Sequence, residues 1–97
     1  MQANSRSSGE QTGATTSVVA GPCALTSVLV ITDNTNYAKV VIDDSIDGTG
    51  IVKYETRVEG ANNYGGRNWT FPVEFTAGVY VTLSGTGASY IIETASP

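Results

Sequence analysis

Short runs of Val, Ile, Thr, Tyr and Phe recur along this chain from residue 18 onward, separated by clusters of Gly, Asn and Asp. β-Branched and aromatic residues favour strands, and Gly, Asn and Asp favour turns. This alternation of strand-forming runs and turn residues indicates an all-β fold. No window combines a helical period with helix caps. The predicted strands cover residues 16–20, 24–32, 37–43, 51–58, 68–76, 79–84 and 89–94.

The length of 97 residues allows one domain. Strands at this spacing predict a small antiparallel β-sandwich or a jelly-roll-like barrel of about seven to eight strands. The cleanest alternation puts Trp69, Phe71, Val73 and Phe75 on one buried face, and Pro72 between them predicts a sheet edge or a bulge. Residues 24–32 are apolar on both faces, Leu29 included, which predicts a central strand that is buried on both faces.

The first seventeen residues contain no Leu, Ile, Val, Phe, Trp or Tyr. Such a segment buries too little apolar surface to offset the entropy lost on ordering. We therefore expect residues 1–17 to be a flexible polar arm and residues 18–97 to be the β-sandwich domain. Because the arm offers many hydrogen-bonding side chains, we expect it to pack across a neighbouring subunit or another protein.

The residue types that most enzymes need are scarce in this chain. It has no histidine, and Cys23 is its only cysteine, so a disulfide within the chain, a Ser-His-Asp triad and the usual zinc ligand sets are excluded. Cys23 stands among small and apolar neighbours, which predicts a buried side chain. The sequence therefore predicts a protein that is not an enzyme, with no catalytic residues, no metal site and no cofactor.

Charge and hydropathy limit the partners. Charged residues make up 14% of the chain, the net charge is −4, and the five basic residues are scattered. This pattern disfavours a nucleic-acid partner. No apolar stretch approaches the roughly 20 residues that span a bilayer, and residues 1–16 lack the apolar core of a secretory signal. We therefore expect no membrane partner and synthesis in a cytoplasm.

Two segments carry the side chains most often used for binding. Residues 43–48, Asp-Asp-Ser-Ile-Asp-Gly, suit either a calcium site outside the EF-hand class or a solvated turn, and Asp and Gly are preferred turn residues. The predicted loop 60–67 holds Asn62, Asn63, Tyr64 and Arg67, an exposed aromatic with amides and a guanidinium, which we predict to be a contact surface. Tyr64, Trp69 and Tyr80 are an alternative sugar platform, although Trp69 also fits the core.

The order of strands and turns resembles the small virion proteins of tailed bacteriophages. The resemblance is carried by the apolar strand after Gly21-Pro22, by the strand that ends at Asp43-Asp44 before Gly48-Thr49-Gly50, by the run Phe75-Thr76-Ala77-Gly78-Val79-Tyr80-Val81, and by the last strand after Gly85-Thr86-Gly87. These are patterns of strands and turns, and they carry over no catalytic residue. Residues 1–17 lie outside them.

The resemblance implies a virion structural protein, made in the host bacterial cytoplasm, that decorates or cements the outer capsid surface. Its expected partner is the major capsid protein or another virion protein, and a homo-oligomer is expected, with a trimer favoured. The alternative is a receptor- or carbohydrate-binding module of a phage fibre or tail. Asn62, Asn63, Tyr64 and Arg67 are then the contact residues.

Overall fold

The computed structural model describes residues 5–96, and residues 1–4 and 97 lie outside the described part. Residues 5–96 form eight strands and one short 3-10 helix, η1. They are β1 (Ser5–Ser7), β2 (Thr15–Val19), β3 (Cys23–Ile31), β4 (Ala38–Asp44), β5 (Ile51–Val58), η1 (Gly60–Asn62), β6 (Tyr64–Phe75), β7 (Val79–Ser84) and β8 (Ser89–Ala95).

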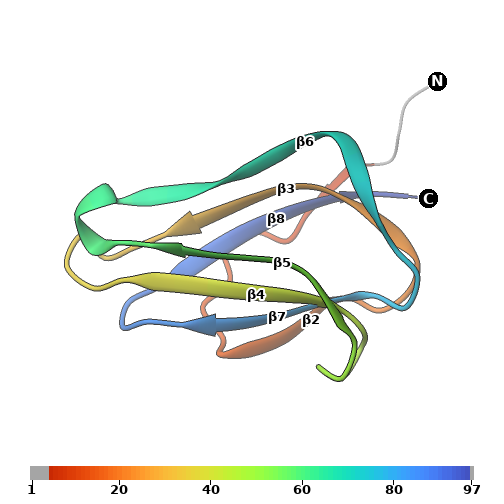
Figure 1. Ribbon diagram of the computed structural model, residues 1–97, viewed down its shortest axis with the longest axis horizontal. Helices are drawn as coiled ribbons and strands as arrows, with labels where there is room; N and C mark the ends of the chain where they lie inside the picture. Colours follow the sequence, from red (N-terminus) through yellow and green to blue (C-terminus); the bar gives the residue numbers. More distant parts are fainter. Residues whose placement is uncertain (1–4, 97) are drawn as a thin grey trace.

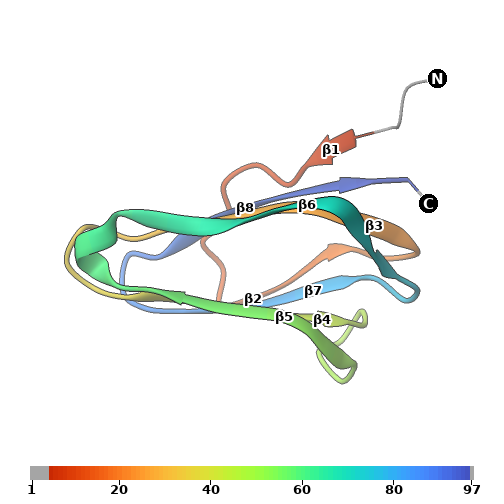
Figure 2. The ribbon, with the colours of Figure 1, turned by 45° about the horizontal axis from the view of Figure 1, so that its top comes forward.

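The strands form two antiparallel sheets that pack face to face, as Figures 1 and 2 show. Sheet A has the order β1-β8-β3-β6, and sheet B has the order β2-β7-β4-β5. The first strand pairs with the eighth, the second with the seventh, the third with the sixth and the fourth with the fifth. This nesting is the jelly-roll arrangement, and it confirms the predicted fold class.

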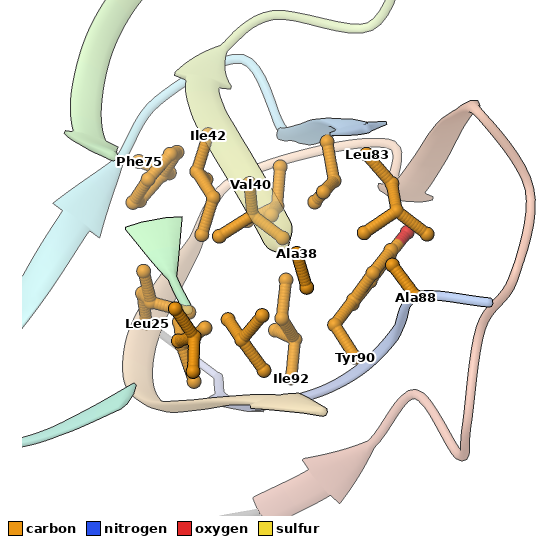
Figure 3. Packing of buried hydrophobic residues seen from close by; sticks show 14 of the residues in the cluster. Leu25, Ala38, Val40, Ile42, Phe75, Leu83, Ala88, Tyr90 and Ile92 are labelled. Carbon is orange, nitrogen blue, oxygen red and sulfur yellow. The ribbon is translucent and has the colours of Figure 1, made fainter. Parts of the chain in front are cut away.

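The core lies between the two sheets. Val40 and Ile42 of β4, with Leu83 of β7, face Tyr90 and Ile92 of β8 (Figure 3). The buried core as a whole draws on every strand except β1 and β2, with Ala88 added from the turn before β8, and Cys23 is among its members, as predicted. A chain of this size that buries few large side chains has a thin core, so its strand edges and loops matter for stability.

Bulges change which side chains face the core. In β3 the pairing register shifts between Leu25 and Ser27, so Leu25, Val28 and Val30 all point inward. Leu29 points outward and is 39% exposed, so the prediction that this strand is buried on both faces is wrong, whereas its predicted central position is confirmed.

The prediction that Phe71 shares a buried face with Trp69 and Phe75 is wrong. Four residues of β6, 69–72, lie opposite the single residue Thr26, which makes a large bulge. Phe75 is fully buried and Trp69 is half-buried, whereas Phe71 is 86% exposed. Pro72 lies inside this bulge on an edge strand, where its missing N–H breaks no ladder bond, and that prediction is confirmed.

The N-terminal segment differs from the separate arm that the sequence predicted. Residues 5–7 form β1 and pair with β8, while residues 15–19 form β2 and pair with β7. Backbone N–H and C=O groups hold residues 5–17 to their own domain, together with the side chains of Ser8 and Glu10, which bond to Ile92 and Ser89. The part of the expected arm in residues 1–4 lies outside the described residues.

Candidate functional site

The four predicted contact residues do not share one loop. Asn62 ends η1, and Asn63 has a φ of 66°, a left-handed conformation that asparagine tolerates better than most residues. Tyr64 and Arg67 lie in β6, so the prediction of a loop through residue 67 is wrong. The reason is that β3 is long enough to pair with residues 64–68 despite their two glycines.

Thr32 fixes the start of β6. Its backbone N–H donates to the Asn63 carbonyl at 2.7 Å, and its buried hydroxyl reaches the carbonyls of Gly60 and Asn63 at 3.1 and 3.0 Å. These bonds give partners to the carbonyls of Gly60 in η1 and of Asn63 just after it. The position of Tyr64, the next residue, is thereby set by the end of β3.

Tyr64 and Arg67 both line a hollow on the outer face of sheet A. The hollow has a volume of about 520 Å³, and its lining residues are Ser27, Val28, Leu29, Tyr64, Gly65, Gly66, Arg67, Asn68, Ile91 and Glu93. Asn62 and Asn63 are not among them. The structure therefore brings together two of the four predicted residues and adds partners from β3 and β8.

The sequence pattern missed those partners because they depend on strand pairing. Leu29 pairs with Gly66 on one side and with Ile91 on the other, and Ser27 pairs with Asn68 and Glu93. Residues directly opposite one another in a sheet point to the same face, so these pairs form rows across sheet A. Only the register reveals such rows.

Aromatic and cationic side chains gather at the free side of the sandwich between β5 and β6. The rings of Tyr54 and Trp69 meet edge to face, with centroids 5.0 Å apart and planes at 83°. The Arg67 guanidinium carbon lies 5.3 Å from the centre of the Trp69 ring, within cation–π range. Trp69 thus packs against the core margin and supports Arg67.

The alternative sugar platform of Tyr64, Trp69 and Tyr80 does not form. Tyr64 points outward from sheet A, where it pairs with Ile31, and it is 66% exposed. Trp69 packs toward the core. Tyr80 belongs to sheet B, where it pairs with Asp43. The three rings therefore lie in three different places.

The acidic segment 43–48 uses each carboxylate in a different contact. Asp43 is buried and accepts a hydrogen bond from the Ser45 hydroxyl at 2.5 Å, and Asp47 accepts from the Thr49 hydroxyl at 2.6 Å. The Asp44 carboxylate accepts from the backbone N–H groups of residues 76–78 at 2.8–3.2 Å. Within residues 5–96 there is no group of three or more metal-ligating side chains.

These contacts hold Asp44 in its charged form. The amides of Thr76 and Ala77 lower the pKa of Asp44 from its ordinary value of 3.8 to about 2. The contact also ties the end of β4 to the turn after β6. Asp44 is therefore a structural brace at this end of the sandwich.

A second hollow, of about 590 Å³, lies beside the N-terminal strands. Its lining includes Arg6, Cys23 and Thr94, and no aromatic side chain is among the residues that form it. Burial raises the pKa of the Cys23 thiol, and the charge of Asp44 adds to this effect. A raised thiol pKa disfavours the reactive thiolate, so Cys23 is a packing residue here.

Exposed apolar side chains lie at the end of the sandwich where β6 bulges and β5 begins. Phe71 in the bulge is exposed at this end, and so are Ile51, which is 76% exposed, and Val52 at the start of β5. Lys53 Nζ lies 6.0 Å from the centre of the Phe75 ring, which places the start of β5 beside the end of β6. The β6 bend and the 45–50 loop share this end of the molecule in both ribbon views (Figures 1 and 2). We call Ile51, Val52 and Phe71 the apolar end.

Comparison of the chain with protein-family models, with curated proteins and with solved structures finds no match. Among residues 5–96, no helix is long and apolar enough to cross a bilayer.

Proposed function

We propose that this protein is a structural subunit of a bacteriophage virion, a decoration or cement protein that binds the outer capsid surface. The observation that carries the proposal is Phe71, a large aromatic side chain that a wide bulge holds 86% exposed. Bulges at sheet edges re-aim side chains, and exposed aromatics anchor protein–protein interfaces.

Burial of the apolar end by a partner protein is energetically favourable. Burying a side chain of this size contributes about 1.5–3 kcal/mol relative to leaving it in water. The free chain gains little of this for Phe71 and Ile51, which are 86% and 76% exposed, whereas a partner bound at this end would bury them. Exposed apolar residues grouped in this way mark interaction surfaces.

The fold and the sequence support the same function. Jelly rolls with two sheets recur in viral capsid proteins, and the strand and turn pattern of residues 21–94 resembles small phage virion proteins. Both supports are analogies, because one fold serves many functions. The thin core and the apolar end also favour self-association, and we propose a trimer.

Sedimentation tests the self-association. We expect the full chain to associate at micromolar concentration and Phe71→Ser to remain monomeric with an unchanged thermal midpoint. Tyr64→Ser is the matched control, because it removes another exposed aromatic side chain on the outer face of sheet A and leaves the apolar end intact. A wild-type chain that stays monomeric, or equal effects of the two substitutions, would contradict the proposed trimer.

Cross-linking of the assembled virion tests the capsid partner. The chain has two lysines, Lys39 and Lys53, and Lys53 lies at the apolar end. Lys39 is on the outer face of sheet B, where its Nζ is 3.5 Å from Glu55 Oε2. We expect Lys53 to cross-link to a capsid protein far more often than Lys39. Absence of this chain from purified virions would refute the function itself.

A further inference from the structure

The hollow on the outer face of sheet A is made by a missing side chain. Tyr64, Gly66 and Asn68 alternate along β6 and point outward, beside Ile31, Leu29 and Ser27 of β3. Tyr64 and Asn68 are four residues apart, which is about 13 Å along a strand. Only hydrogen stands between their side chains, at Gly66, so the outer face is open there down to Leu29.

No other residue can occupy position 66 without moving the sheet. A Cβ atom on Gly66 would lie 2.0 Å from the Val28 carbonyl oxygen, and its φ is +153°. The gap is therefore fixed by the backbone of β3 and does not depend on a flexible side chain. A hollow of this kind is preformed, which lowers the entropy cost of binding.

The walls of the hollow differ in chemistry. Its floor is apolar, formed by Leu29 and Ile91. One end carries the exposed ring of Tyr64, and the other end carries Asn68 with a hydrogen-bonded pair, in which the Ser27 hydroxyl donates to Glu93 Oε1 at 2.8 Å. Arg67 borders the hollow, but it pairs with the inward-facing Val28 and its guanidinium lies against the Trp69 ring on the other face of β6. An apolar floor with a few convergent polar groups is typical of small-ligand sites, and about 520 Å³ is within their usual size.

We propose that this hollow binds a neutral hexopyranose unit of a glycan. A pyranose ring has a face of C–H groups, which suits the ring of Tyr64 and the floor of Leu29 and Ile91, because aromatic faces carry partial negative charge. Its hydroxyl groups both donate and accept, which suits the carboxylate of Glu93, the amide of Asn68 and the hydroxyl of Ser27. Among the lining residues that point outward, Glu93 is the charged one, so the site disfavours an anionic ligand.

The sheet geometry argues against a polypeptide in the hollow. β3 and β8, which form its floor, each pair with a strand on both sides, so their backbone N–H and C=O groups are already used. A peptide that adds as a strand needs a free sheet edge, and the free edge nearest the hollow is the outer side of β6, where a peptide would lie beside the floor and not over it. The site therefore favours a ligand that carries its own hydrogen-bonding groups around an apolar face, as a sugar does.

The site is separate from the apolar end, so the two proposals can fail independently. The experiment uses an array of neutral and sialylated glycans and an NMR titration with methyl glucoside, methyl galactoside, methyl mannoside and N-acetylglucosamine. We expect the full chain to bind at least one neutral glycan, and we expect Tyr64→Ala and Glu93→Gln each to weaken that binding at least tenfold. Phe71→Ser is the control, and it should bind as the wild type does.

Chemical shifts identify where the sugar lies. Under the proposal, the amide signals of Leu29, Gly66 and Ile91 shift on titration, and the thermal midpoints of the two variants stay at the wild-type value. No binding to any neutral glycan overturns the proposal, and so does binding to sialylated glycans alone. It is also overturned if Tyr64→Ala alters sedimentation instead of glycan binding, because a second copy then covers this face.

Discussion

The two open sides of the sandwich are closed in different ways. On the side of β1 and β2, residues 8–14 cross from sheet A to sheet B as a strap. The strap makes backbone hydrogen bonds between Gln11 and Tyr90 in both directions, at 2.8 and 3.1 Å, and the Leu83 N–H donates to the Ala14 carbonyl at 2.8 Å. On the side of β5 and β6, the rings of Tyr54 and Trp69 fill the opening instead.

The difference shows that polarity alone does not make a segment independent of its domain. The strap has no large apolar side chain, yet its backbone satisfies the edges of β7 and β8. The aromatic side has large apolar side chains, yet the pairing of β6 is interrupted by the bulge and Phe71 stays in water. Backbone pairing closes one side, and side-chain packing closes the other.

We expect the largest loss of stability from Gly66→Ala, on the aromatic side. The new methyl group would meet the Val28 carbonyl oxygen at 2.0 Å, so β6 must separate from β3 at this point. A backbone displacement of this kind falls among the severe effects, about 3 kcal/mol or more. Denaturant unfolding followed by tryptophan fluorescence measures it.

The matched control is Gly9→Ala, in the strap. Gly9 also has a positive φ, of +67°, but a Cβ atom there meets nothing within 4 Å. The expected loss is about 1 kcal/mol, from backbone strain alone. Equal losses for the two variants would show that the close approach at Gly66 relaxes without effect.

The next largest effect is expected from Trp69→Ala. Truncating a buried large aromatic costs about 3–5 kcal/mol, and because Trp69 is only half-buried we expect about 2–3 kcal/mol. The loss arises from the contact with Tyr54 and from the margin of the core. Tyr54→Ala should give a loss of similar size, and the double variant should lose less than the sum of the two. Additive losses would mean that the rings do not act as a pair.

The strap is expected to contribute less. Deleting residues 2–14 removes the described backbone bonds to β7 and β8 and uncovers Tyr90, and each such bond contributes about 0.5–1.5 kcal/mol net. With the entropy of the strap regained, we expect a loss of about 1–2 kcal/mol. Gln11→Ala, which keeps the backbone bonds, should change stability by less than about 0.5 kcal/mol. If the deletion leaves stability unchanged, the result would support the prediction, made from polar composition, that the arm is separate from the domain.

The positions of most strands could be predicted from the sequence, because runs of β-branched residues between turn residues reflect the local preference of the backbone for a strand. Two features did not follow. The bulges at Thr26 and at residues 69–72 depend on pairing between distant strands, so the alternation predicted the wrong environment for Leu29 and Phe71. The pairing of residues 5–7 with β8 depends on backbone groups, which every residue type carries, so composition gave no signal for it.

The residues of the candidate site were likewise predictable from sequence only in part. Tyr64 and Arg67 stood out in the sequence as an exposed aromatic and a cation beside two glycines. Ile91 and Glu93 reach the same hollow only because β8 pairs with β3, more than sixty residues away in the chain. Their chemistry is ordinary in the sequence, and the register alone makes them members of the site.

Asp44 secures β6 after its bulge, and its effect depends on pH. Its pKa is about 2 in the folded chain and near 3.8 in the unfolded chain, so its contribution is fully present above pH 3.8 and is lost as the pH falls toward 2. Asp44→Asn cannot titrate there. We expect the variant to have a lower thermal midpoint than the wild type near neutral pH and a smaller difference near pH 2. Parallel curves at all pH values would show that the Asp44 charge is not what braces the turn.

The smallest effect is expected from Tyr90→Phe, beneath the strap. The Tyr90 side chain is fully buried and extends toward Leu83 (Figure 3), and its hydroxyl lacks a well-placed partner within residues 5–96. Removing an unsatisfied buried hydroxyl is neutral or stabilising, by up to about 1 kcal/mol.

Burial also raises the pKa of Tyr90, and the Thr16 hydroxyl opposes this only in part. A raised folded-state pKa stabilises the fold below the unfolded pKa near 10 and loses that contribution as the pH rises, so the advantage of Tyr90→Phe should widen above pH 10. Tyr64→Phe, at an exposed position, should leave the thermal midpoint unchanged. A fall of more than about 1 kcal/mol in Tyr90→Phe would instead mean that the hydroxyl bonds to Thr16 and that this bond stabilises the fold.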